Sequence, residues 1–409
     1  MKIRIILTTL ISLLWLPVIT PQTLQTGADV FLSEIPQLVA NKRLGVVTNH
    51  TALVGGKVHI VDTLHKILSI TTLFGPEHGI RGDAPAGDHI DDSRDPRTGI
   101  PVYSLYGKHR KPTAEMLRNV DILLFDIQDV GARFYTYIST LYHCVESASE
   151  NNLPLIVLDR PNPLGGELVE GPIIKKEFYS FVGITELPIV HGMTVGELAL
   201  YFNDIIKEKS GRSAEIRVIK MKGWSRGKPF VEYGLDFVKP SPNLADINSI
   251  LVYPGTCLLE ATNVSEGRGT ETPFSVYGAP FINPEELIHQ LELKGTVGVE
   301  LKPAEFIPGD IPGMAVNPKH EGQKCFGVKM RVTDPVTFRP VRFGLLLLST
   351  LNQLYPGKFS ITRDRFNRLC GDNNIYELIT SNASAEKIFN SSDTGIQEFK
   401  EKRIKYLLY

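Results

Sequence analysis

The chain has few cysteines and almost no net charge. Its four cysteines, Cys144, Cys257, Cys325 and Cys370, lie far apart and form no CxxC pair. This spacing excludes a zinc ribbon and a thioredoxin motif, and we predict buried free thiols. The formal net charge is −1 over 409 residues. Nucleic acid and anionic membrane surfaces usually require a basic excess, so we expect neither as a partner.

Several common motifs are absent as well. The sequence contains no GxxxxGK[ST] phosphate loop, no GxSxG nucleophile elbow and no HExxH metal pair. Gly267-Arg268-Gly269 is a lone GxG without the rest of a dinucleotide fingerprint. Dinucleotide binding therefore has little support, and we predict neither a cofactor nor a metal.

The N-terminus carries a targeting pattern. Lys2 and Arg4 precede an apolar run from Ile5 to about Ile19. A run of roughly 15 residues is shorter than the roughly 20 that span a membrane. A charged start before such a run is typical of a signal peptide. We predict a signal peptide over residues 1–23 and a periplasmic or secreted protein; an uncleaved anchor is the alternative.

The length favours two domains, because single cores stop growing at roughly 250–300 residues. Over residues 24–240, apolar runs at 44–47, 68–74, 122–125 and 155–158 alternate with helical patterns. Such continuous runs predict parallel strands buried on both faces, hence an α/β, Rossmann-like domain. Helices are expected from Thr113, over Tyr137–Glu150, and after a capping box of Thr194 and Glu197.

The remaining sequence divides into two parts. Residues 241–280 are rich in Pro, Gly, Asn and Thr, and we interpret them as an interdomain connection. Residues 281–409 regain periodicity, with helices expected from Pro284 and Phe343 and a strand over 328–332. We predict a smaller α/β or α+β domain there.

Polar residues follow all four predicted strands. They are Asn49 and His50 after the first, Glu77 and His78 after the second, Asp126, Gln128 and Asp129 after the third, and Asp159, Arg160 and Asn162 after the fourth. In open parallel sheets, ligands bind outside the carboxyl ends of the strands. These side chains are therefore expected to converge on one crevice.

Glu77 lies in the most unusual segment, Gly75-Pro76-Glu77-His78-Gly79-Ile80-Arg81-Gly82. Pro76 stiffens the turn, and the glycines permit sharp bends and the close approach of a ligand. A glutamate presented in this way is well placed as a general acid. The alternative is that Glu77 pairs with Arg81 to hold the loop.

An acidic stretch follows, with Asp83, Asp88, His89, Asp91, Asp92 and Asp95. With His78 these residues could ligate a divalent cation, although their spacing matches no calcium loop or zinc signature. We favour a solvated loop that can fold over the crevice as a lid.

Two further segments carry polar and aromatic groups. Arg133, Tyr135 and Tyr137 follow the third strand, where aromatic faces suit a sugar ring and an arginine suits a carboxylate on it. Alternatively, the tyrosines pack in the core while Asp126 caps the next helix. Residues 262–271 add Glu266 and Arg268 in a loop that could close the crevice.

Four blocks, at 74–79, 126–137, 159–163 and 266–270, together resemble the exo-β-N-acetylmuramidases of glycoside hydrolase family 171, earlier a domain family of unknown function. The resemblance runs from about Gly45 to the C-terminus. It implies release of N-acetylmuramic acid from the non-reducing end of peptidoglycan fragments. It also implies a Rossmann-like domain, a smaller C-terminal domain and a cleft between them. The family's proposed catalytic glutamate falls on Glu77.

This resemblance gives the polar residues expected roles. Glycosidases usually use two carboxylates, so Glu77 is the predicted acid, with Asp129 ranked before Asp126 and Glu266 as its partner. Arg133 or Arg268 is expected to bind the lactyl carboxylate of muramic acid. The predicted substrate contacts are Asn49, His50, His78, Arg81, Gln128, Arg133, Tyr135, Tyr137, Arg160, Asn162 and Arg268. Two alternatives stay open: an exported two-domain binding protein for a sugar or cell-wall fragment, and a metal-dependent hydrolase.

Overall fold

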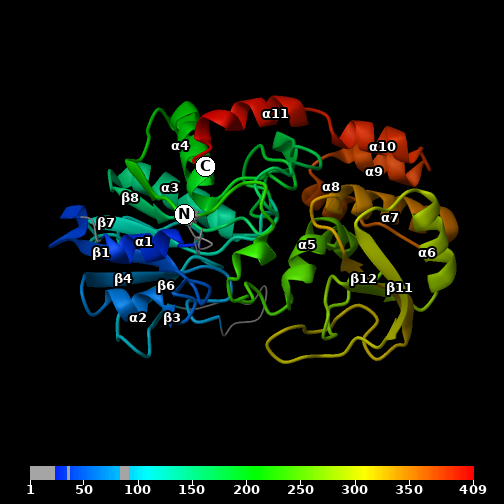
Figure 1. Ribbon diagram of the computed structural model, residues 1–409, viewed down its shortest axis with the longest axis horizontal. Helices are drawn as coiled ribbons and strands as arrows, with labels where there is room; N and C mark the ends of the chain where they lie inside the picture. The colour runs from blue at the N-terminus through cyan, green and yellow to red at the C-terminus, as the bar shows by residue number, and fades with distance from the viewer. Residues whose placement is uncertain (1–23, 35–36, 83–91) are drawn as a thin grey trace, which may run out of the picture.

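A seven-stranded sheet organises the N-terminal domain in the computed structural model, which describes residues 24–34, 37–82 and 92–409 (Figure 1). The predicted signal peptide lies outside these residues. Neighbouring strands are parallel, except that β5 is antiparallel to β6. The predicted Rossmann-like parallel sheet is therefore confirmed. In spatial order the strands are β5 (Ser93–Arg94), β6 (Pro101–Ser104), β4 (Ser69–Gly75), β1 (Arg43–Thr48), β7 (Ile122–Asp126), β8 (Leu155–Leu158) and β9 (Ile216–Ile219).

Helices cover both faces of this sheet, which explains the continuous apolar runs. Successive side chains of a strand point to opposite faces. Leu123 and Phe125 of β7 join the core cluster that contains α3 and α4, whereas Ile122 and Leu124 join the cluster that contains α1 and α2. The four helices are α1 (Gly27–Ser33), α2 (Ile60–Leu64), α3 (Tyr137–Asn151) and α4 (Val195–Ser210).

The second domain is an α+β body. Its antiparallel sheet has the order β10-β12-β11, and helices pack against it (Figure 1). Residues 241–280, interpreted from the sequence as a connection, contain α5 and β10. The strands are β10 (Val276–Ala279), β11 (Val299–Phe306) and β12 (Cys325–Val332), and the helices are α5 (Ile247–Thr256), α6 (Pro284–Leu293), α7 (Pro340–Leu354), α8 (Arg363–Cys370), α9 (Asn373–Thr380) and α10 (Ala385–Ser392).

The chain then returns to the first domain. Helix α11 (Ile396–Arg403) leads from the second domain back to α4, as Figure 1 shows in red. Tyr406 packs edge-on against Tyr201 of α4, with 5.3 Å between ring centroids. The Tyr409 hydroxyl donates to the buried Asp159 carboxylate at 2.7 Å. The C-terminal segment therefore ties the two domains together.

Most sequence-predicted local features are present, with one exception. The capping box of Thr194 and Glu197 starts α4 as expected, and all four cysteines are free and buried. The helix predicted from Thr113 is wrong, because residues 114–119 form only turns. The Leu117 N–H donates to the Thr113 carbonyl, but the Val120 N–H reaches only three residues back, so no helical ladder develops.

Candidate active site

The strand order locates the crevice of the N-terminal sheet. From β1 the chain proceeds to β4 and β6 on one side, and then to β7, β8 and β9 on the other. The order therefore reverses between β1 and β7. Open α/β sheets bind ligands outside the carboxyl ends of the strands at such a switch point. Asn49 follows β1 and Asp129 follows β7, so both lie at this position.

Glu77 occupies a tight turn after the neighbouring strand β4. The Gly79 N–H donates to the Pro76 carbonyl at 3.0 Å, which closes the turn. His78 has a φ of 70°, a left-handed value that is uncommon for a residue with a side chain. Such strain persists where the surroundings impose it, often at functional sites. The turn leaves the Glu77 side chain half-buried at its corner.

Hydroxyl groups surround the Glu77 carboxylate. Thr136 donates from Oγ1 to Oε2 of Glu77 at 2.6 Å. Thr136 precedes α3 as its N-cap, yet its hydroxyl does not cap the helix, so it is available to Glu77. Burial, then the charge of Glu77 and a hydrogen bond to it, raise the pKa of Tyr106 to about 12. The register of β4 and β6 pairs Gly75 with Ser104, which places Tyr106 beside Glu77.

Two buried tyrosines connect Glu77 to the switch point. The rings of Tyr135 and Tyr137 pack edge-on with 4.7 Å between centroids, and the Tyr137 hydroxyl donates to the Pro240 carbonyl at 2.7 Å. Burial raises the pKa of Tyr137, and the negative charges of Glu77 and Asp129 raise it further. Glu77 and Asp129 follow β4 and β7, the two strands that pair with β1, so both carboxylates lie at the same edge of the sheet.

Asp129 is held through one oxygen. Its Oδ2 accepts from the Gly131 N–H at 2.7 Å and lies 3.6 Å from Nε2 of His191. Its buried Oδ1 has no hydrogen-bond partner among the described residues. Buried polar atoms are rarely left without a partner in folded proteins. An unpartnered carboxylate oxygen at a switch point therefore indicates a place for a ligand or a reacting water.

His191 is a site residue that the sequence did not reveal. It is fully buried, and its Nδ1 accepts the Met193 N–H at 3.2 Å. Because Nδ1 accepts, the ring proton of neutral His191 lies on Nε2, which faces Asp129. His191 precedes α4 in a loop that follows no predicted strand, so no strand-end pattern marked it.

Asp126 is not available for catalysis. Both of its oxygens accept from Arg160, Oδ1 from Nε at 2.5 Å and Oδ2 from Nη2 at 2.9 Å, and both side chains are buried. This pairing disfavours the prediction of Asp126 as a catalytic group. Arg160 also donates to the Leu53 carbonyl at 3.3 Å. This pair holds the ends of β7 and β8 and leaves Arg160 with little capacity for a substrate.

Arg133 also has a structural role. Its fully buried guanidinium donates to four backbone carbonyls, at distances of 2.6–2.9 Å: those of Pro172, Leu187, Leu369 and Cys370. The last two residues belong to α8 of the second domain. The prediction that Arg133 binds a sugar carboxylate is wrong, because packing encloses it as an interdomain clamp.

Glu266 and Arg268 lie in an ion-pair cluster of the second domain. Glu266 accepts from Lys319 Nζ at 2.9 Å and lies 3.4 Å from Arg268 Nε. Arg268 also donates to Glu260 at 2.8 Å, and its guanidinium lies over the Phe274 ring. These pairings leave neither Glu266 nor Arg268 free for the predicted roles of second carboxylate and lactyl ligand.

Other predicted contact residues stabilise the loops. Arg81 pairs with Asp62 and Asp95 at 2.8 and 2.9 Å. His50 Nε2 lies 2.7 Å from the Lys239 carbonyl. Asn162 donates to the Met193 carbonyl at 3.0 Å and so holds the loop of His191.

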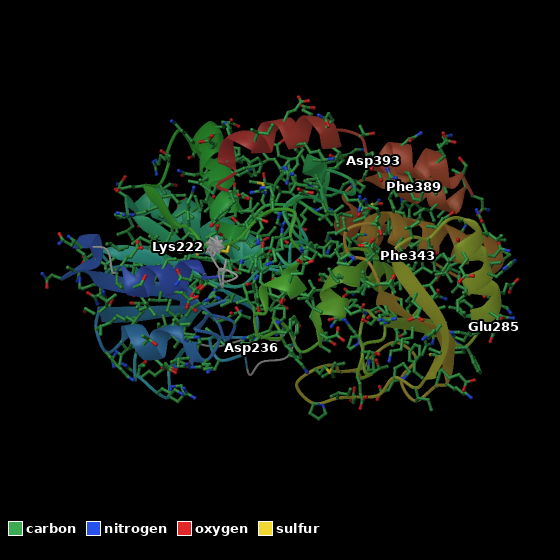
Figure 2. The ribbon with its side chains drawn as sticks, viewed as in Figure 1. Lys222, Asp236, Glu285, Phe343, Phe389 and Asp393 are labelled. Carbon is green, nitrogen blue, oxygen red and sulfur yellow. The ribbon has the colours of Figure 1, made fainter. Side chains whose placement is uncertain are left out.

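A pocket of about 300 Å³ lies beside the switch point. Gln128 and Arg160 line it together with residues 233–238, which include Asp236, labelled in Figure 2. The Gln128 amide donates to the Asp129 and Pro161 carbonyls, both at 2.7 Å. Gln128 therefore supports the backbone of Asp129 while facing this pocket.

The metal-site alternative has little structural basis. Asp83, Asp88, His89 and Asp91 lie outside the described residues. Asp92 accepts the Ser104 N–H, and Asp95 pairs with Arg81. Within residues 24–34, 37–82 and 92–409, no group of three or more His, Cys, Asp or Glu side chains is arranged to hold a metal ion. Over the same ranges, no helix is long and apolar enough to cross a membrane.

A fifth strand end contributes to the site and escaped prediction. Strand β6 is short and begins with a proline, so its apolar signal is weak. It is followed by Tyr106 and by a basic run, Lys108-His109-Arg110-Lys111. Because β6 is parallel to β4, this run begins at the same edge of the sheet as Glu77. A run of basic residues shortly after a short strand segment was the available signal.

Comparisons with known proteins agree with this architecture. The chain matches the model of the N-terminal part of exo-beta-N-acetylmuramidase NamZ over residues 44–248 and that of its C-terminal part over residues 251–409. It is 47% identical over 388 residues to the peptidoglycan beta-N-acetylmuramidase NamZ of Bacillus subtilis, covering 94% of this chain and 91% of the relative. Two crystal structures of DUF1343 family proteins from Bacteroides fragilis are each 32% identical, with TM-scores of 0.86 and 0.76, and cover 95% of this chain and 99% of theirs.

Proposed function

The chain belongs to the exo-beta-N-acetylmuramidase NamZ family, and from this premise we propose which of its groups perform the hydrolysis. The protein is a glycoside hydrolase that releases N-acetylmuramic acid from the non-reducing end of peptidoglycan fragments. In our proposal Glu77 is the general acid and Asp129 is the second carboxylate. The supporting observation is that Glu77 and Asp129 follow β4 and β7, the two strands that flank β1 at the switch point, and that Asp129 keeps one oxygen without a partner in the described residues.

Glu77 would donate a proton to the glycosidic oxygen as the bond to the anomeric carbon breaks. A general acid must be held within hydrogen-bond reach of the atom it protonates. The Pro76–Gly79 turn fixes the Glu77 backbone. The hydrogen bonds of Thr136 and Tyr106 orient its carboxyl group. These contacts restrict Glu77 to a narrow range of positions, as proximity catalysis requires.

Asp129 would act on the anomeric centre, either directly or through a water molecule. Its Oδ2 is held by the Gly131 N–H and faces His191, whereas its Oδ1 has no hydrogen-bond partner in the described part of the chain. A buried carboxylate fixed by one oxygen, with the other oxygen left without a partner in the described residues, suits both a nucleophile and a general base.

The two roles predict different dependences on the leaving group. A nitrophenolate leaves readily without a proton, whereas a sugar alkoxide does not. Glu77→Gln should therefore lower kcat on a MurNAc–GlcNAc disaccharide by about 10²–10⁴-fold, the usual contribution of a general acid. On a nitrophenyl muramic acid glycoside the loss should be much smaller. Asp129→Asn should lower kcat strongly on both substrates. Reducing-sugar release and nitrophenol absorbance measure the two reactions.

An exposed residue provides a matched control. Glu115 lies in the turns that lead into the amino end of β7, at the opposite edge of the sheet, and Glu115→Gln should match wild type on both substrates. If Glu77→Gln loses equal activity on both substrates, Glu77 is not the acid. If the wild type releases no muramic acid from the disaccharide, the proposed function itself fails.

We also propose that the enzyme is exported. The proposal rests on the charged and apolar pattern of residues 1–23 and on a cell-wall substrate that lies outside the cytoplasm. N-terminal sequencing of the enzyme from culture fluid or periplasmic extract should find residues 1–23 removed. Recovery of the intact N-terminus from the cytosol alone would contradict export.

A further inference from the structure

An arginine beside the Glu77 site has no carboxylate partner in the described part of the chain. Among the arginines considered for substrate recognition, Arg133 binds backbone carbonyls and Arg268 binds glutamates. Arg110 differs from both. It is exposed, and its guanidinium carbon lies 4.6 Å from the centroid of the Phe181 ring. Its charge therefore faces the solvent at the edge of the sheet where Glu77 lies.

Two independent contacts connect Phe181 to Glu77. Tyr106, which hydrogen-bonds to Glu77, packs against Phe181 with 6.0 Å between ring centroids. The first turn of α3 makes the second connection. Its N-cap, Thr136, donates to Glu77, and Ser139 donates to the Phe181 carbonyl at 2.7 Å. Phe181 and Arg110 are therefore positioned relative to the catalytic acid through both a ring contact and a helix end.

The loop that carries Phe181 is itself well fixed. Ser180 and Gly183 exchange backbone hydrogen bonds of 3.1 and 3.0 Å, which place Phe181 in a tight turn. His143 of α3 stacks on the same ring, with an interplanar angle of 12° and a centroid distance of 6.2 Å. A ring held in this way can orient a guanidinium before substrate arrives, which lowers the entropic cost of binding.

The chemistry of Arg110 suits a carboxylate. A guanidinium that stacks on an aromatic face keeps its N–H edge free, and this planar fork matches a carboxylate with two parallel hydrogen bonds. Lys108 adds positive charge to the same loop, whereas Lys111 pairs with Glu146 and Glu150. Muramic acid differs from glucosamine by a lactyl ether on C3, which is two ring bonds from the anomeric carbon. Its carboxylate therefore lies near the bond that Glu77 would cleave.

We propose that Arg110, held on Phe181 beside Tyr106, binds the lactyl carboxylate of N-acetylmuramic acid and gives the enzyme its preference over N-acetylglucosamine. This assignment rests on the proposed function, because it takes the glycosidic bond to lie at Glu77. It replaces Arg133 and Arg268, which the sequence had suggested for the same task.

The experiment compares the nitrophenyl glycosides of three sugars. They are N-acetylmuramic acid, the carboxamide of its lactyl group, and N-acetylglucosamine. The carboxamide keeps the size of the lactyl group and removes its charge. Arg110→Gln should lower kcat/KM on the acid by about 10- to 100-fold, as expected for a lost charge-assisted hydrogen-bonded pair. Its kcat/KM on the carboxamide should stay within about twofold of wild type. Arg110→Lys should retain part of the preference, since it keeps the charge and loses the fork.

Several outcomes decide the proposal. Arg118, exposed at the amino edge of β7, supplies a charge-matched control, and Arg118→Gln should match wild type on all three substrates. Unchanged turnover of the carboxamide shows that Arg110→Gln is folded. If the ratio of kcat/KM on the acid to kcat/KM on the carboxamide stays within about twofold of wild type in Arg110→Gln, the proposal is overturned. It is also overturned if the wild-type enzyme has the same kcat/KM on the acid and the carboxamide. Failure of the proposed function would instead appear as no muramic acid release by wild type at all.

Discussion

Replacing Arg133 by methionine should destabilise the protein more than most single substitutions. Its guanidinium is fully buried and donates to four carbonyls, two of which belong to residues 236 and 237 positions away in the sequence. Methionine fills similar space but donates no hydrogen bond. Each buried carbonyl left without a partner costs about 2 kcal/mol. Burial lowers the Arg133 pKa to about 10, so removing the cation relieves a cost of about 3 kcal/mol. The net loss should be about 5 kcal/mol.

Urea unfolding followed by tryptophan fluorescence measures this loss as a change in the free energy of unfolding. Arg133→Lys should lie between wild type and Arg133→Met, because one ammonium group cannot reach carbonyls on both sides. Arg118→Met provides the exposed control and should change stability by less than about 0.5 kcal/mol. A loss below about 1 kcal/mol for Arg133→Met would refute the reasoning, since it would mean that water satisfies the four carbonyls at no cost.

Two further predictions concern buried ionisable groups. His191→Ala should lower kcat with little change in KM, because Asp129 loses the N–H that faces it. His191→Gln should restore part of the lost kcat, and an unchanged kcat for His191→Ala would rule out this positioning role. Burial raises the pKa of Glu170 to about 7 from 4.5, so the folded protein binds the Glu170 proton more tightly than the unfolded chain does. The stability that this proton contributes is therefore lost as the pH rises from about 4.5 to 7. In urea titrations, the free energy of unfolding of Glu170→Gln should therefore fall less between pH 5 and 7.5 than that of wild type. The fall that remains in the variant should come from Asp159, whose pKa burial raises to about 6. A pH dependence equal to that of wild type would contradict this prediction.

The parallel sheet was predictable because both of its faces are buried. Runs such as Ile122–Phe125 are apolar throughout, and this pattern does not depend on distant partners. The Thr194 capping box is equally local. By contrast, β6 begins with a proline and ends with a serine, so its apolar signal is weak, and Tyr106 beyond it was missed. The position of Glu77 followed from its strand end and its Gly-Pro turn, both of which are features of adjacent residues.

The partners of charged side chains were not predictable in the same way. Asp126, Asp129 and Arg133 occupy one short segment with similar local context. Packing separates their roles: Asp126 meets Arg160, Asp129 keeps one oxygen without a partner in the described residues, and Arg133 enters the domain interface. Which carboxylate is neutralised depends on residues far along the chain. Composition and spacing identify the candidate segment, and only the fold distinguishes the candidates.

The domain interface connects the stability of the fold to the geometry of the site. Arg133 donates to carbonyls at the carboxyl end of α8, and Glu170 accepts the Val341 and Arg342 N–H groups at the amino end of α7. A cation at a helix carboxyl end and an anion at a helix amino end are each favourable. Both clamps come from loops of the first domain, and Arg133 lies four residues after Asp129. Loosening this clamp should therefore displace the second domain and the strand-end loop together, so Arg133→Met should lower kcat even at temperatures where the protein stays folded.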